Sequence, residues 1–320
     1  MSNLHATPLH QIFRAVSIAT LVLAVGLSAV DMVPGSLPQQ GPQGRSPELA
    51  EILNRCAAYC ERLSDAVLDF VCQERVDEMV ADLAIELPAK SAESAGFENP
   101  GDLQGIAKSS DPGQKVSSVR VKRKNRSQFI YDYQLVQDKQ GHIQETRSLI
   151  KENGRQVMEK NALLKTQVFK YSYIIMGPVT LLGRDRQQLF NYDVIKETTL
   201  GKDRAVVIKA TPKPNSPRGI LSGKIWVRKS DAGVLRIEWV PESVGHYDKL
   251  AALAKQMGGD LRLTLATELG VEKNGIRFPS RYTIEETYSF ATGTPLVRSM
   301  TEVTLSDYKF FTVETGVVIR

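Results

Sequence analysis

The sequence predicts an α+β protein built on one large curved antiparallel sheet, an incomplete β-barrel of about 10 or 11 strands with helices packed on its concave face. Three observations predict it. Runs of β-branched and aromatic residues alternate with polar residues along most of the chain, tight-turn sequences separate these runs, and strands do not alternate regularly with helices. The clearest example is Gly223 to Trp239, where two such runs flank the turn Lys229-Ser230-Asp231-Ala232-Gly233.

Composition excludes several function classes. The chain has 320 residues, 42% of them hydrophobic, and a formal net charge of +5, which is too mild an excess for a dedicated nucleic-acid-binding protein. Three cysteines and four histidines show no metal-ligand spacing, so no metal and no cofactor are expected. The group Ser243, His246 and Asp248 lacks a nucleophile elbow. The sequence therefore predicts no catalytic residue and a protein that is not an enzyme.

The N-terminus carries the signature of export. Arg14 precedes an apolar run from Ala15 to Val30 that ends in small residues. This pattern predicts a secretory signal over residues 1–29, and the run is shorter than the roughly 20 residues that span a bilayer. The alternative is an uncleaved inner-membrane anchor at 15–30. Residues 30–46 are rich in Pro, Gly and Gln and predict a flexible linker before a single domain at 47–320. We expect the protein in the periplasm or cell envelope.

The first helix and strand of that domain follow from capping and periodicity. Ser46-Pro47 begins a helix that ends near Ser64, and residues 68–76 form a strand. In an exported protein we expect a disulfide between Cys60 and Cys72, which would join this helix to this strand and stabilise the fold by about 3 kcal/mol.

The middle of the chain predicts a long polar loop at 81–115, then strands at 116–137, 143–152 and 156–159, with Asn153-Gly154 as a hairpin turn. Apolar residues at helical spacing between 161 and 186 predict a helix that Gly177-Pro178 ends. This segment either caps the core or forms a mobile lid over an apolar cavity.

The remaining elements are strands at 190–199 and 204–211, the hairpin described first, a short amphipathic helix at 246–257, and strands at 261–268, 277–289 and 296–308. Asn274-Gly275 makes one of the connecting turns.

One run is strongly basic. Five of the seven residues from 120 to 126 are cationic: Arg120, Lys122, Arg123, Lys124 and Arg126. The run is either a solvated strand end or a contact for anionic lipid headgroups or an acidic partner.

The hairpin contains the pattern G-K-I-W-V-x-x-x-D-x-x-V-L-R-I-E between Gly223 and Glu238. With the preceding helix, the meander of strands and the helical insertion, it resembles the LolA/LolB-like superfamily of periplasmic lipoprotein carriers, which includes the domain of RseB-type envelope-stress regulators. The resemblance in layout extends from Pro47 to the C-terminus. Residues 59–63 and 70–74 resemble a separate bacterial branch of that group.

The resemblance implies an apolar cavity that shields the acyl chains of a lipid or lipoprotein, at about 0.8 kcal/mol per CH₂ group. A role in outer-membrane lipoprotein sorting and peripheral membrane contact would follow. The alternative is an envelope protein-interaction or stress-sensor module without bound lipid. Candidate cavity residues are Phe129, Tyr131, Tyr133, Trp226, Ile237, Trp239, Leu263, Leu265, Ile284 and Tyr288.

Overall fold

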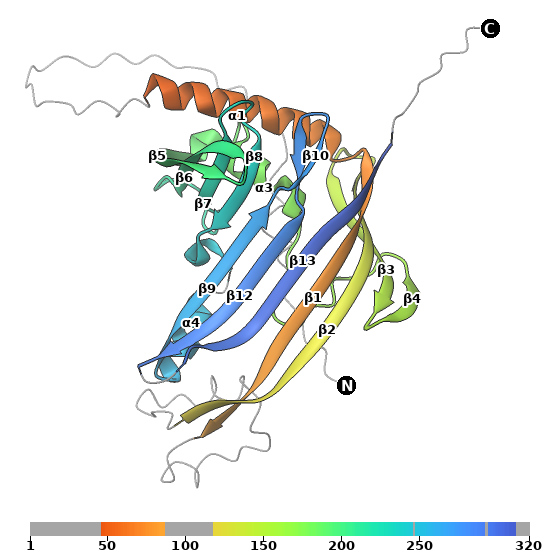
Figure 1. Ribbon diagram of the computed structural model, residues 1–320, viewed down its shortest axis with the longest axis vertical. Coiled ribbons are helices and arrows are strands. Elements are labelled where there is room, and N and C mark those ends of the chain that lie inside the picture. The colour runs from red at the N-terminus through yellow and green to blue at the C-terminus, as the bar shows by residue number, and fades with distance from the viewer. Residues whose placement is uncertain (1–45, 87–117, 246, 292–293, 312–320) are drawn as a thin grey trace, which may run out of the picture.

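A computed structural model describes residues 46–86, 118–245, 247–291 and 294–311. Their main feature is one open sheet of 11 strands, in which each strand is antiparallel to its neighbours and β4 and β5 are the two edges (Figure 1). The predicted fold class is confirmed. The spatial order is β4 (Arg155–Glu159), β3 (Ile143–Glu152), β2 (Ser118–Gln137), β1 (Phe70–Glu86), β13 (Leu296–Phe310), β12 (Arg281–Phe290), β9 (Gly259–Glu268), β8 (Val234–Trp239), β7 (Gly223–Arg228), β6 (Asp203–Pro212) and β5 (Phe190–Leu200).

The predicted tight turns are present. Asn153 and Gly154 both have positive φ (49° and 80°) between β3 and β4, as a two-residue hairpin turn requires. Between β7 and β8, Ala232 has a φ of 60° and the Asp231 carboxylate accepts a hydrogen bond from the Gly233 amide (3.0 Å). The hairpin predicted from the sequence pattern is therefore confirmed.

Three α-helices are described: α1 (Pro47–Ala66), α3 (Gly177–Leu182) and α4 (Tyr247–Gln256), with 3₁₀ turns η2 (Ile174–Met176), η3 (Gln187–Leu189) and η4 (Pro241–Ser243). Ser46 caps α1, because its Oγ accepts a hydrogen bond from the Leu49 amide (3.3 Å). Helix α1 packs against α3, and α4 packs against β9 (Figure 1). No described helix has the length and apolar character that crossing a bilayer requires.

Strand boundaries differ from expectation at two places. Strand β1 continues to Glu86, so the first six residues of the expected 81–115 loop are strand; residues 87–115 lie outside the described part of the chain. The expected strand at 277–289 is two strands, β11 (Ile276–Phe278) and β12, separated at Pro279. Strand β11 pairs with β10 (Val271–Lys273) around Asn274-Gly275. The expected signal at 1–29 and the expected linker at 30–46, apart from Ser46, also lie outside the described residues.

The predicted helix ending at Gly177-Pro178 is wrong. Residues 161–173, here called the strap, are irregular, and the helix α3 begins at Gly177. Pro178 sits in the first turn of α3, where its missing amide hydrogen costs nothing. The strap amides bond to side chains of the sheet in place of helical carbonyls, which is why its apolar periodicity does not produce a helix.

The predicted disulfide between Cys60 and Cys72 is not formed, because all three cysteines are buried free thiols. Cys60 lies beside Cys56 on α1, whereas Cys72 on β1 interacts with the Tyr308 hydroxyl of β13. Burial raises the pKa of Cys56 to about 12 and also raises those of Cys60 and Cys72. The three thiols are therefore components of the core.

Candidate functional site

The sheet divides at one end. The ladder between β1 and β13 stops at the pair Val80–Ser299. Beyond it, β1 and β2 remain paired as far as Glu86–Ser118, and β12 and β13 remain paired to Tyr288–Leu296. Two strand pairs therefore separate at the lower end in Figure 1 and leave a fork between them.

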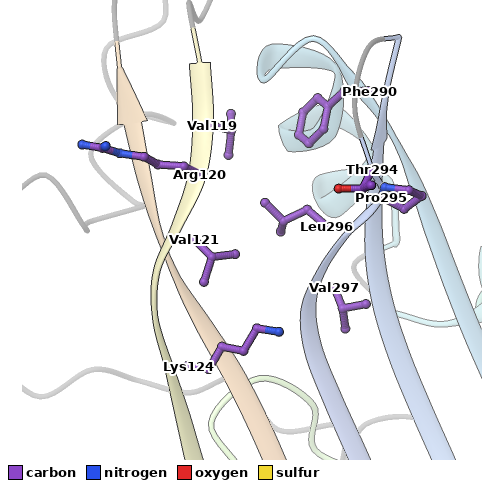
Figure 2. Close-up of a pocket in the computed structure, with 9 residues that line it drawn as sticks. All are labelled: Val119, Arg120, Val121, Lys124, Phe290, Thr294, Pro295, Leu296 and Val297. Atoms are coloured by element: carbon purple, nitrogen blue, oxygen red, sulfur yellow. The ribbon is translucent and has the colours of Figure 1, made fainter.

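A groove of about 440 Å³ occupies this fork. Figure 2 shows its residues: Val119, Arg120, Val121 and Lys124 of β2 on one side, and Phe290, Thr294, Pro295, Leu296 and Val297 on the other. Six of the nine described lining residues are apolar, Thr294 is polar, Arg120 and Lys124 are cationic, and none of the nine is acidic. Its volume falls in the range of about 300–1,000 Å³ that small-molecule pockets occupy.

The groove continues into an apolar cluster beneath α4. The buried members of this α4 cluster are Ala81, Leu83, Ala254, Met257 and Tyr288, and the groove residues Val119, Phe290 and Leu296 pack against it. Leu261 also packs against it and against a second cluster on the same sheet, formed by Leu263, Leu265 and Ile284. An apolar path therefore runs from the fork along β9 and β12.

The structure places the predicted cavity residues in three groups. Leu263, Leu265, Ile284 and Tyr288 lie on the apolar path, and half-buried Trp239 packs at its far end, where its indole N–H donates to Thr267 Oγ1 (3.0 Å). The others on the buried face are 4% exposed or less and belong to the main core with α1: Phe129, Tyr131, Tyr133 and Ile237.

Trp226 does not belong with the other candidates. Its strand neighbours Ile225 and Val227 are buried, whereas Trp226 is half-buried and lies under the Arg236 guanidinium, 5.8 Å from the ring centroid. Successive strand residues face opposite sides, so Trp226 is on the other face of the sheet.

The basic run lies on β2 at the fork. All five of its cationic side chains are exposed, but only Arg120 and Lys124 line the groove. Figure 2 shows that the Arg120 side chain extends away from the apolar wall, whereas the Lys124 side chain points across the groove toward Val297. Whether this run contacts an anionic partner stays a prediction.

A buried ionic network lies on the same sheet, away from the groove. Arg147 donates to both Glu74 carboxylate oxygens (2.6 and 3.1 Å) and to Glu145 (2.8 Å). Its guanidinium also lies over the rings of Tyr133 and Tyr171, 5.0 and 5.5 Å from their centroids. Glu74 is fully buried, and burial raises the pKa of its carboxyl while Arg147 opposes that shift.

This network and its neighbours tie down the strap. Glu145 accepts a hydrogen bond from the Tyr173 amide (2.7 Å), and Tyr131 accepts one from the Lys165 amide (3.1 Å). Buried Glu78 accepts from the amides of Gln167 and Val168 (2.9 and 3.1 Å). Charged acceptors make hydrogen bonds roughly twice as strong as neutral ones. The strap is therefore a fixed cover of the core, which agrees with the first of its two predicted roles.

The described residues offer little support for a catalytic group or a metal site. Ser243 Oγ donates to the Val240 carbonyl (2.6 Å) and accepts from the Ser222 amide (3.2 Å), so its hydroxyl serves the backbone; His246 lies outside the described residues. No group of three or more His, Cys, Asp or Glu side chains in the described ranges is arranged to hold a metal ion.

Sequence reasoning missed most of the groove and the ionic network. Glu74 follows Phe70 and Cys72 on one strand face, so a charged residue in an apolar series was a readable signal for a buried pair. The apolar groove residues carry no such signal, because they line a cavity only where the β1–β13 ladder ends.

No protein-family model matches the chain, and no curated protein matches it. Similar solved structures include a DUF1329 family protein from Desulfovibrio piger, with 10% identity and a TM-score of 0.34 over 84% of this chain and 95% of that chain. A LolA superfamily protein from Nitrosomonas europaea shows 10% identity and a TM-score of 0.31 over 82% and 97%. The Pseudomonas aeruginosa MucA/MucB complex shows 8% identity and a TM-score of 0.21 over 83% of this chain and 100% of that chain. At these identities and TM-scores nothing about function rests on the similarity.

Proposed function

We propose that the protein is an exported, non-enzymatic binding protein that holds an acyl chain of a lipid or lipidated protein in the fork groove, in a lipid- or lipoprotein-handling role at the cell envelope. The observation that carries this proposal is the 440 Å³ groove, whose apolar lining residues Val119, Phe290 and Leu296 continue into the α4 cluster. Transfer of each CH₂ group from water onto such walls is worth about 0.8 kcal/mol. The apolar N-terminal run supports export.

Helix α4 is the element that would move to lengthen the site. Among its ten residues only Ala254 is fully buried, while Tyr247 and Leu253 are half-buried against the apolar clusters, so a limited set of apolar contacts holds it on the sheet. Beneath it lies the apolar path with four of the predicted cavity residues. The strap, in contrast, is held by hydrogen bonds to buried carboxylates and is a poor candidate for the gate.

The experiment measures binding of a dansyl-labelled undecanoic acid to the full chain by fluorescence. Val121→Arg places a long side chain in the groove wall, and we expect it to weaken binding by about tenfold. Val194→Arg is the matched control, because Val194 is an exposed valine on the edge strand β5, outside the groove. The added positive charge would by itself attract the carboxylate, so a loss at Val121 reports the blocked wall.

Equal affinity for the wild type and the Val121→Arg variant would contradict binding in the fork. Failure of the wild type to take up the fatty acid or an added phospholipid, with a ligand-free mass in native mass spectrometry, would contradict the function itself.

A second candidate is a protein-interaction module that binds no lipid. Two large apolar side chains near the β4 edge favour it: Met158 is 85% exposed and Leu163 is 83% exposed. Exposed apolar residues that cluster on a surface mark contact sites for other proteins. This alternative predicts that Met158→Lys and Leu163→Lys impair function in cells while Val121→Arg does not.

A further inference from the structure

We infer that the ligand of the fork groove is a single-chain amphiphile with an anionic headgroup, and that Lys124 selects that headgroup. This inference rests on the proposed lipid-binding function and specifies the chemistry of its ligand.

The position of Lys124 supports this role. It lies on β2 opposite Ala81 of β1, in the part of β1 beyond the last β1–β13 pair. Its side chain is exposed and points across the groove toward Val297 (Figure 2). The ammonium group therefore lies where the fork closes, one residue beyond the last β1–β13 pair, and can meet the head of an amphiphile whose chain lies along the groove.

The charge of Lys124 is not compensated within the described residues. It takes part in no ion pair there, and the nearby Asp82, which pairs with Arg123 across the ladder, accepts a hydrogen bond from Asn125 (2.9 Å). The described residues that line the groove include no carboxylate. An anionic headgroup would supply the missing partner, whereas a cationic one would be repelled.

The surroundings of Lys124 strengthen this preference. Lys122, Arg123 and Arg126 are exposed on the same strand and outside the groove. Clustered charges of one sign raise the local concentration of oppositely charged ligands, but they act at a distance and fall off with salt. Lys124 is the member of the run that can also make direct contact, and this difference can be measured.

The groove also limits the number of chains. Its volume of about 440 Å³ lies in the lower half of the range for sites that hold one small molecule. Phe290 and Leu296 continue into the α4 cluster, so one chain entering beside Lys124 would run along a single apolar path.

The test compares three probes with the same twelve-carbon chain: dodecanoate, dodecanol and dodecyltrimethylammonium. Binding to the full chain is measured by isothermal titration calorimetry at pH 8 and physiological salt, below the micelle concentrations. We expect dodecanoate to bind tightest and the cation weakest. Lys124→Gln should weaken the binding of dodecanoate by about fivefold, the effect expected from loss of a partly exposed charge pair, and should leave the affinity for dodecanol unchanged.

Lys122→Gln is the matched control, since it removes the same charge from the same strand outside the groove. It should change dodecanoate affinity by less than about twofold at this salt. Lys124→Arg, which keeps the charge, should preserve the preference for dodecanoate.

Three results would overturn the inference. Equal affinity of the wild type for dodecanoate and dodecanol would remove headgroup selection while leaving lipid binding in place. Equal losses of dodecanoate affinity in Lys122→Gln and Lys124→Gln would show that the basic run acts by long-range electrostatic attraction and that Lys124 makes no direct contact with the headgroup. Absence of binding for all three probes would reject the proposed function together with the inference.

Discussion

Removal of Arg147 should destabilise the protein more than any surface charge does. Arg147 is 8% exposed and donates three hydrogen bonds of 2.6–3.1 Å to Glu74 and Glu145, and Glu74 is fully buried. In Arg147→Met both carboxylates lose their cation. Loss of one partner of a buried pair costs about 3–5 kcal/mol, because it leaves an uncompensated charge away from water.

The assay is urea unfolding at pH 7, followed by tryptophan fluorescence and by circular dichroism, with the free energy of unfolding from linear extrapolation. Arg75→Met is the matched control, because Arg75 makes an exposed ion pair with Asp77 (2.8 Å) on the same strand as Glu74. Its expected cost is below about 1 kcal/mol.

A double variant separates burial of a charge from loss of packing. In Glu74→Gln/Arg147→Met one of the two stranded carboxylates becomes neutral, so the double variant should be more stable than the sum of the single changes predicts, by about 0.5–3 kcal/mol. A cost for Arg147→Met below about 1 kcal/mol, or strict additivity in the double variant, would refute the account of a buried network that holds the strap.

Three further predictions concern other parts of the fold. Glu272 accepts a hydrogen bond from Arg228 (3.1 Å), which holds the pKa of the Glu272 carboxyl below the usual 4.5. The stabilisation from this contact is present above pH 4.5 and is lost as the pH falls through the lower pKa of the folded state. Arg228→Gln removes the contact, so it should flatten the fall of thermal stability between pH 6 and pH 3. A Cβ at Gly177 would lie 3.2 Å from the Trp239 ring, so Gly177→Val should cost about 1–3 kcal/mol by urea unfolding and shift the fluorescence of Trp239, whereas no change in either would argue against close packing of α3 on β8. The three buried cysteines should react with Ellman's reagent only after unfolding, and a reductant should not alter thermal stability. A fall in thermal stability on reduction would instead support the disulfide that the sequence predicted.

Much of the fold could be predicted from local signals. The Asn153-Gly154 turn, the hairpin around Asp231 and the capped first helix follow from short-range backbone preferences, and each is present. The strap could not be predicted in this way. Its apolar spacing favours a helix, but its amides find partners on β1, β2 and β3, which are distant in sequence.

The candidate site divides along the same line. The basic character of residues 120–126 and the apolar character of Leu263, Leu265, Ile284 and Tyr288 were readable from the sequence. The sequence did not show that Lys124 points into a groove while Arg120 extends away. Side-chain direction depends on the register of β2 against β1, which shifts between Asp82 and Leu83.

The sequence by itself determined that this chain forms an antiparallel sheet with covering helices, because alternation and turn residues act over a few neighbouring positions. It also determined that one stretch of strand carries concentrated positive charge. Only the tertiary structure decided where the sheet splits, which cysteines meet, and which charged residues are buried. Those outcomes depend on how strands far apart in the sequence align, and in particular on the end of the β1–β13 ladder at Val80–Ser299, where the fork begins.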